Sequence, residues 1–332
     1  MFDVITVGSA TVDVFVDTES ELIKIRTPKH LEELIAYPSG SKILIRDIIF
    51  MTGGGGTNTA VSFARLGLKT AYFGKMGDDD NGKRILTELK KEKIEFVGYV
   101  SKKKEDRTAY SIILDSIEHD RTILAYKGCM NSFSMEHTDR KKLKAKWFYF
   151  SSLVGDAFKT QEKLAEFAKK NGIKVAFNPS NYQAEKGPLF LSRVLRNTEV
   201  LILNDEEAGL LVRGSIKEML VKLSRLGPKI VVITKGKKGS EAYDGKYHYD
   251  LKARKIKVVE TTGAGDCFAS TFIAMLIKGR DVKSAMKLAQ INSESVIQYK
   301  GAKNNLLSYK KLINSSRKTK ISIKKSILNQ KM

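Results

Sequence analysis

A short glycine-rich stretch ends in a carboxylate, a combination that can bind an anion and move a proton. Its residues are Thr262-Gly263-Ala264-Gly265-Asp266. Two glycines let backbone N–H groups converge without side chains between them, and the apolar run that follows predicts a helix whose positive end lies at the same point. The sequence therefore predicts a site for an anion such as phosphate. Asp266 lies within it, where it can accept a proton from an attacking hydroxyl or simply cap the helix.

Two earlier stretches carry residues that can bind a ligand. Asp13 is an isolated acid among apolar neighbours, placed at the end of the first predicted strand, and ligands of open α/β sheets bind beyond such strand ends. The run GGGGTN at residues 53–58 opens a predicted helix, lets a ligand approach the backbone, and presents the amide of Asn58. Asn58 replaces the third glycine of a dinucleotide-binding spacing, which argues against a dehydrogenase.

The rest of the chain predicts an α/β fold. Beyond residue 143, apolar β-branched segments alternate with amphipathic segments, which is typical of a mainly parallel sheet covered on both faces. Strands at 229–234 and 256–259 are expected to lead towards the glycine turn. Residues 94–127 are rich in predicted strands and form an insertion in this alternation, and a short helix is predicted at 29–36.

The net charge of +22 first suggests nucleic-acid binding, but the distribution of the charge favours solvated lysine faces. Lysine runs such as residues 102–104 lack the interleaved aromatic side chains that stack on bases. The segment 310–332 is an exception, because it carries many lysines with leucine and isoleucine between them. It can form a basic amphipathic helix against a partner, RNA or a membrane surface, or it can be a frayed cationic end, which we favour.

Length and composition predict a cytoplasmic protein with a substantial core. The chain has 332 residues, 42% of them hydrophobic, and two cysteines that cannot make a disulfide framework. Its first residues lack the regions of a signal peptide and predict a strand. The longest uncharged run in the helix after the glycine turn, residues 267–277, is too short to span a bilayer.

Taken together, Asp13, the glycine loop and the glycine-aspartate turn resemble the ribokinase-like (PfkB) family of carbohydrate and nucleoside kinases, from Val4 to about Leu307. The stretch from Glu260 to Phe268 is the more specific of the two family signatures. The resemblance implies a single ribokinase-like kinase domain over 1–309, with a mainly parallel central sheet, helices on both faces and a small β-sheet lid from parts of 10–51 and 94–127. The basic tail is then 310–332.

The resemblance also implies the activity and the site. It implies a kinase that moves the γ-phosphoryl of ATP to a hydroxyl of a sugar or nucleoside, with Mg²⁺, a closing lid and a homodimer through that lid. Asp266 would be the general base and the amides of 263–266 an anion hole. The resemblance implies the catalytic residues Gly263, Ala264, Gly265 and Asp266, and it implies that the acceptor is bound by Asp13, Gly54, Gly55 and Asn58. It implies that the nucleotide is bound by Asn204, Thr234, Gly236 and Asn292. The magnesium ion would be bound by Asn204 and Glu207.

Three departures from the family pattern leave questions open. Glu260 stands where the family usually has Asp, beside a monovalent-cation site, so the resemblance does not decide whether K⁺ activates the protein. Gly55 stands where ribokinase-type members often carry Lys, and the segment 151–153 (Ser-Ser-Leu) has no acid where ribokinases place a sugar-binding glutamate. The acceptor can thus be a sugar, a nucleoside or a sugar phosphate. A non-catalytic sensor on the same fold remains an alternative, although it would be expected to have lost the Gly-Ala-Gly-Asp sequence.

Overall fold

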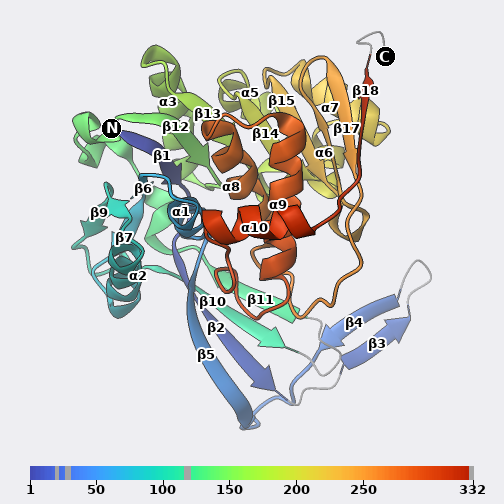
Figure 1. Ribbon diagram of the computed structural model, residues 1–332. Helices are drawn as coiled ribbons and strands as arrows, with labels where there is room; N and C mark the ends of the chain where they lie inside the picture. The colour runs from blue at the N-terminus through green and yellow to red at the C-terminus, as the bar shows by residue number, and fades with distance from the viewer. Residues whose placement is uncertain (19–21, 27–30, 116–120, 329–332) are drawn as a thin grey trace.

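The computed structural model describes residues 1–18, 22–26, 31–115 and 121–328, and a large central sheet organises them (Figure 1). The strands of this sheet are β1 (Phe2–Val7), β6 (Thr70–Phe73), β8 (Glu95–Phe96), β12 (Ala145–Phe150), β13 (Lys174–Phe177), β14 (Val200–Asn204), β15 (Ile230–Thr234), β16 (Ser240–Tyr243), β17 (Tyr247–Leu251) and β18 (Ile323–Ile327). Their order is β18-β17-β16-β15-β14-β13-β12-β1-β6-β8. Neighbouring strands from β15 to β8 are parallel, and β16 to β18 form an antiparallel edge.

Helices cover both faces of the sheet, as the alternating sequence predicts. Successive strand residues point to opposite cores: Phe148 and Phe150 of β12 pack into one, Trp147 and Tyr149 into the other. The first core also contains side chains of α3 (Asp156–Lys170), α4 (Asn181–Ala184), α5 (Gly187–Leu195), α6 (Asp205–Leu211) and α7 (Ile216–Ser224). The second contains side chains of α1 (Gly55–Arg65), α8 (Ala264–Ile277), α9 (Val282–Val296) and α10 (Tyr309–Lys318). This arrangement fixes the carboxyl ends of the parallel strands at one edge, where the site lies.

A smaller sheet lies below the central sheet in Figure 1 and carries Asp13, one of the predicted acceptor residues. Its strands are β2 (Thr11–Thr18), β5 (Ile45–Gly53), β10 (Ala109–Asp115) and β11 (Arg121–Tyr126), in the order β11-β10-β2-β5. Three of the four fall inside the ranges predicted for a lid, and β5 runs two residues beyond the first range, to Gly53. The helix α2 (Asp80–Lys91) packs Ile85 and Leu89 into a third core with Val12 of β2, and so ties the small sheet to the large one.

Two short strand pairs complete the β-structure of the described residues. They are β3 (Leu22–Arg26) with β4 (Leu31–Ile35), and β7 (Lys75–Gly77) with β9 (Tyr99–Ser101). The helix predicted at 29–36 is therefore wrong over 31–35, while residues 27–30 lie outside the described part of the chain. The leucine spacing of this segment suits a helix turn, but pairing with the preceding strand decides its conformation.

The basic tail is not a frayed end over the residues that the structure describes. Ser308 caps α10, and Leu312 of that helix is fully buried in the second core. β18 then pairs antiparallel with β17 along the edge of the large sheet. The ammonium of Lys325 lies 3.6 Å from the centre of the Tyr247 ring, so at least one tail lysine covers an aromatic surface of the same chain. The division of the chain at residue 309 remains a prediction.

Two further features of the structure are the length of its helices and the state of its cysteines. Among the helices of the described residues, none is long and apolar enough to cross a membrane. Cys129 and Cys267 are both free and buried. The predicted cytoplasmic location remains a prediction.

Candidate active site

The glycine turn forms the N-terminus of α8, with one glycine required by packing and one facing open space. Gly263 caps the helix in the left-handed conformation, with φ 76°. A Cβ there would lie 2.4 Å from the Cβ of Ala302, so no other residue fits. A Cβ on Gly265 would meet no described atom within 4 Å. The turn thus gives a ligand access to the start of the helix, where the dipole and the free amides favour an anion.

The predicted anion-hole amides are not equally available. The N–H of Ala264 donates to the carbonyl oxygen of Thr261 at 3.2 Å. Gly265 and Asp266 occupy the next two positions of the first helical turn, where backbone N–H groups have no acceptor within the helix. These two amides are therefore the ones best placed to bind a charged group.

The strand predicted at 256–259 is wrong. Between the end of β17 and the start of α8, residues 252–263 contain no strand. Val258 and Val259 are about half exposed, at 50% and 48%, and the N–H of Val259 donates to the carbonyl oxygen of Ile297 at the end of α9. Their β-branched side chains favour a strand locally, but the segment has a helix end and no strand as its neighbour.

Asp266 meets Asn58 across the interface of α8 and α1. The side-chain amide of Asn58 donates to Oδ2 of Asp266 at 2.9 Å, although the two residues are 208 positions apart. Burial raises the pKa of Asp266, and the hydrogen bond from Asn58 and the positive charge of Lys303 oppose that shift. The other amide atom of Asn58, Oδ1, is buried and has no hydrogen-bond partner among the described residues. The predicted base and the predicted acceptor residue are thus brought together.

The glycine loop brings a second carboxylate close to the backbone. A Cβ on Gly53 would lie 1.8 Å from Oδ2 of Asp13, so the glycine is needed for that approach. Thr11 donates to Oδ1 of Asp13 at 3.0 Å. Burial raises the pKa of Asp13, opposed by hydrogen bonds from Thr11 and Ser111 and by the charge of Lys303. Asp13 lies within β2 of the small sheet, so its predicted position at the end of the first strand is wrong.

The two predicted acceptor glycines have different environments. Gly54 has φ 93° and a Cβ there would lie 2.5 Å from the carbonyl oxygen of Ser9, so its conformation and packing both require glycine. A Cβ on Gly55 would lie 2.9 Å from the side chain of Ser151 and 3.5 Å from Oδ1 of Asp266. Gly55 therefore keeps the space directly beside the Asp266 carboxylate free.

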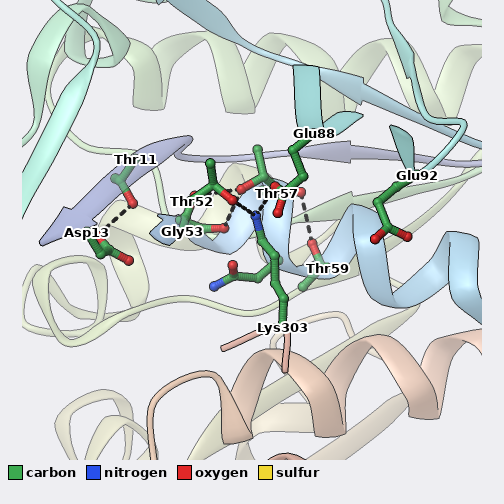
Figure 2. Close-up of polar contacts among 12 residues, drawn as sticks. Thr11, Asp13, Thr52, Gly53, Thr57, Thr59, Glu88, Glu92 and Lys303 are labelled. Atoms are coloured by element: carbon green, nitrogen blue, oxygen red, sulfur yellow. Dashed lines mark hydrogen bonds and ion pairs between the residues drawn. The ribbon is translucent and has the colours of Figure 1, made fainter. Parts of the chain in front are cut away.

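A buried lysine supplies positive charge near both carboxylates, and Figure 2 shows its contacts with Thr52 and Glu88. Lys303 is 7% exposed, and its ammonium donates to Oε2 of Glu88 at 2.5 Å and to the hydroxyl of Thr52 at 3.0 Å. Burial lowers the pKa of Lys303, and Glu88 opposes this shift. Lys303 also attracts the carboxylates of Asp13 and Asp266 electrostatically. Its own partners lie on the small sheet (Thr52) and on α2 (Glu88), so these two elements position the positive charge that acts on the site.

A cavity of about 290 Å³ opens in front of Asp266. Of the predicted site residues, it is lined by Asp266, Gly55 and Glu207. Side chains that the sequence analysis did not assign complete its wall, and they are Ser9, Lys127, Met130, Asn131, Ser151, Ser152, Leu153, Val154, Asn178, Pro179, Ser180 and Tyr182. Hydroxyl and amide groups thus predominate around a space at the small end of the range for ligand sites.

Asn204 and Glu207 form a complete capping box at the start of α6. Oδ1 of Asn204 accepts from the N–H of Glu207 at 2.7 Å, and Oε2 of Glu207 accepts from the N–H of Asn204 at 3.0 Å. Glu207 is 8% exposed yet lines the cavity, and burial raises its pKa to about 7. The Asn-x-x-Glu pattern therefore has a structural role in this chain as a helix cap.

Of the other residues predicted to bind the nucleotide, Thr234 and Gly236 lie at the same edge of the sheet, and Asn292 lies in the helix α9 behind it. Thr234 ends β15, and Gly236 follows in a left-handed turn with φ 51°, where a Cβ would meet no described atom within 4 Å. Asn292 is fully buried in α9: its amide donates to the Thr271 hydroxyl at 2.8 Å and its carbonyl accepts from the N–H of Leu307 at 2.9 Å. The predicted adenine contact of Asn292 stays a prediction.

The Glu260 carboxylate ties the glycine turn to the segment after α9. The Thr262 hydroxyl donates to Oε1 of Glu260, and the N–H of Gly301 donates to Oε2 at 2.8 Å. Because Gly263 packs against Ala302 in that same segment, Glu260 fixes the position of the turn.

Sequence reasoning missed most of the cavity wall, and part of it could have been found. Ser151 and Ser152 follow β12, and Asn178 follows β13, so the rule that ligands bind beyond strand ends points to them. Lys127 and Tyr182 belong to segments without such a signal. Only the fold places them at the cavity.

The mainly parallel sheet, the small covering sheet and a carboxylate at a helix N-terminus define the ribokinase-like class of α/β folds. Comparison with protein families agrees, since the model of the pfkB family carbohydrate kinases matches residues 2–308. The chain therefore belongs to the pfkB family of carbohydrate kinases, and it is an ATP-dependent carbohydrate kinase. Kinases of this family use ATP with Mg²⁺.

Individual relatives and solved structures fit this placement. The chain is similar to a 5-dehydro-2-deoxygluconokinase of Clostridium perfringens, with 30% identity over 266 residues, covering 74% of this chain and 78% of that protein. It is 26% identical to an uncharacterized sugar kinase of Archaeoglobus fulgidus over 74% of this chain and 98% of that protein. Arabidopsis thaliana ribokinase, solved with ribose and ATP, shares the fold with a TM-score of 0.77 at 22% identity, over 95% of this chain and 99% of that one.

Proposed function

We propose that this kinase transfers the γ-phosphoryl of ATP to a hydroxyl of a small sugar or nucleoside held in the cavity beside Asp266. The observation that carries the proposal is the joint position of Asp266 at the N-terminus of α8, hydrogen-bonded to Asn58, with Gly55 leaving the adjacent space free. Phosphoryl transfer depends mainly on positioning and on stabilisation of charge, and this site offers both.

Asp266 acts as the general base in this proposal. Its carboxylate accepts the proton of the acceptor hydroxyl as the hydroxyl oxygen attacks the phosphoryl group. Burial raises the pKa of Asp266, which makes it a stronger base than an exposed aspartate, and the hydrogen bond from Asn58 and the charge of Lys303 oppose this shift. The amides of Gly265 and Asp266 stabilise the negative charge on the group in transfer, and Asp13 and Oδ1 of Asn58 accept hydrogen bonds from other acceptor hydroxyls.

The residues on the nucleotide side fit Mg²⁺ and ATP in their chemistry. Mg²⁺ keeps several waters and takes one or two carboxylates besides the phosphates of the nucleotide. Glu207 supplies one buried carboxylate at the cavity besides Asp266, and no group of three or more metal-binding side chains occurs among the described residues. We assign Glu207 and Asn204 to the hydrated metal ion, and Thr234, Gly236 and Asn292 to the nucleotide. The metal would neutralise phosphate charge.

The small sheet is proposed to be the lid and the surface of a homodimer. Its two outer strands carry large exposed apolar side chains, with Ile48 and Phe50 on β5 at 45% and 46% and Ile123 and Tyr126 on β11 at 49% and 52%. Exposed apolar residues gathered on one sheet favour a protein partner. A Phe50→Asp variant that stays dimeric by light scattering, with an unchanged dissociation constant, would argue against this surface.

The identity of the acceptor and the effect of K⁺ are tested together by one screen. ADP release is measured over sugars, nucleosides and sugar phosphates, with KCl or with a chloride of a large organic cation. The proposal expects acceptor-dependent ADP release in at least one class. We infer that Glu260 holds the turn through Thr262 and Gly301, so the K⁺ effect is expected to be small. Ligand binding without ADP release across the whole panel would instead support a non-catalytic sensor.

A further inference from the structure

Lys127 gives the cavity a positive end that the proposed chemistry does not use. It is the one cationic residue among the described residues that line the cavity, whereas Asp266 and Glu207 supply carboxylates. The segment that carries it is held firmly, because the next residue, Gly128, has φ 60° and a Cβ there would lie 2.5 Å from the carbonyl oxygen of Arg107. The N–H of Cys129 also donates to that carbonyl at 2.8 Å.

The charge of Lys127 is only partly balanced within the chain. The side chain is partly buried, and its ammonium lies 4.9 Å from the centre of the Tyr182 ring on α4. Burial lowers the pKa of Lys127, and the attraction of Asp13 opposes this. Within the described residues, no carboxylate pairs with it at salt-bridge distance. A desolvated ammonium without an ion pair is costly, and a ligand that carries a negative charge would remove that cost.

The surroundings of Lys127 fit a singly charged, planar group. Asn131 and the hydroxyl pair of Ser152 and Ser180, whose oxygens lie 2.6 Å apart, line the same cavity and can donate further hydrogen bonds. The single ammonium of Lys127 can pair with one negative charge, so a phosphate dianion would keep a second, unpaired charge in a cavity that already holds the carboxylates of Asp266 and Glu207. A carboxylate needs one cation and a few neutral donors.

We propose that Lys127 forms the subsite for the carboxylate of an acidic sugar, so that the substrate class is a sugar acid whose hydroxyl reaches Asp266. This inference rests on the proposed acceptor site in the same cavity. Lys127 then determines specificity without taking part in the transfer of the phosphoryl group or the proton.

The test compares two probes that differ at one carbon, D-gluconate and D-glucitol, by calorimetric titration of the full-length protein. The wild type is expected to bind gluconate about 10- to 100-fold more tightly than glucitol, because one hydrogen-bonded pair of charged groups contributes affinity in that range. Lys127→Met is expected to abolish this ratio and Lys127→Arg to retain most of it. Lys104→Met, which removes an exposed lysine between β9 and β10, is the matched control and should leave the ratio unchanged.

Three results with the acceptor probes would overturn the inference. They are equal binding of the two probes by the wild type, an unchanged ratio in Lys127→Met, and tighter binding of D-glucose 6-phosphate than of gluconate. A rise in the Kd of Lys127→Met for MgATP as large as that for gluconate would also overturn it, because Lys127 would then serve the nucleotide. Absence of ADP release with every acceptor would instead contradict the proposed function, whatever the binding ratios are.

Discussion

The acceptor side and the nucleotide side of the site differ in how much of their polar chemistry is already used by the fold. On the acceptor side, Asn58 keeps a buried oxygen without a partner among the described residues, and Gly55 leaves space beside Asp266. On the nucleotide side, Asn204 and Glu207 complete each other as a helix cap, and Asn292 is hydrogen-bonded through both amide atoms. Polar groups that the fold does not satisfy are the stronger indication of a ligand.

The comparison predicts that the largest loss of turnover comes from a substitution on the acceptor side, at Asp266. Asp266→Asn keeps the size of the side chain and can still pair with Asn58, but it cannot accept the proton of the acceptor. Turnover is expected to fall by about 10² to 10⁴-fold, the usual contribution of a general base. ADP release at saturating substrates measures this, with thermal unfolding as the control for folding. A rate within a few-fold of the wild type would exclude Asp266 as the base.

A smaller, pH-dependent effect is expected from Glu207. Its pKa of about 7 means that the carboxylate becomes fully charged only above neutrality, so the KM for MgATP should fall as the pH rises from 6 to 8. Glu207→Gln keeps an oxygen for the cap and should raise that KM by about 10- to 100-fold, with a flat pH dependence. Steady-state kinetics at several Mg²⁺ concentrations measure both. A pH-dependent KM that survives the substitution would assign the titration to another group.

The raised pKa of Glu207 also makes the stability of the fold depend on pH: a rise in pH should strengthen MgATP binding but weaken the fold. Because burial raises the pKa of Glu207, the folded protein binds this proton more tightly than the unfolded chain does. The contribution of Glu207 to the free energy of unfolding is therefore fully present at acid pH and is lost as the pH rises towards 7 and beyond. Substitution by Gln should remove that pH-dependent contribution.

Lys303 allows a test of how charge behind the site acts on Asp266. Removing its ammonium in Lys303→Met should raise the pKa of Asp266 further, since Lys303 opposes the effect of burial. The acidic limb of the pH profile of kcat/KM for the acceptor should then move to higher pH. Glu88→Gln keeps the lysine and is the matched control, expected to leave the limb in place or to move it slightly to lower pH. An unshifted limb in Lys303→Met would mean that Lys303 serves packing alone.

The smallest kinetic effect is expected for Asn292. Asn292→Ala leaves the Thr271 hydroxyl and the Leu307 N–H without their partner, so the free energy of unfolding should drop by about 1–3 kcal/mol. Denaturant unfolding measures this loss. At a temperature well below the transition, the KM for ATP should change little. A large rise in that KM would favour the predicted adenine contact over the structural role.

Sequence patterns predicted the parts of the fold that depend on local signals. The apolar runs of β12 to β15 and the amphipathic helices between them are visible in the sequence, and the Gly-Ala-Gly-Asp motif points directly to Asp266. The strand β18 is hidden, because lysines interrupt its apolar residues and its partner β17 lies far along the chain. The strand wrongly predicted at 256–259 shows the converse, since β-branched residues without a neighbouring strand do not form one.

The same distinction holds for the site. Asn58 and Asp266 lie in recognisable glycine-rich contexts, whereas Lys127 and Tyr182 reach the cavity only through the way the small sheet and α4 pack. No local pattern marks these two residues. The sequence therefore predicts the residues proposed for chemistry better than the residues proposed for acceptor choice.

The account claims that chemistry lies on the acceptor side and nucleotide binding on the other, and one paired measurement tests this division directly. Calorimetric titration of MgATP into Asp266→Asn and Glu207→Gln, beside the wild type, compares the two sides in a single experiment. The account predicts a Kd close to that of the wild type for Asp266→Asn and a clearly weaker one for Glu207→Gln. Loss of MgATP binding in Asp266→Asn, with wild-type binding in Glu207→Gln, would contradict it.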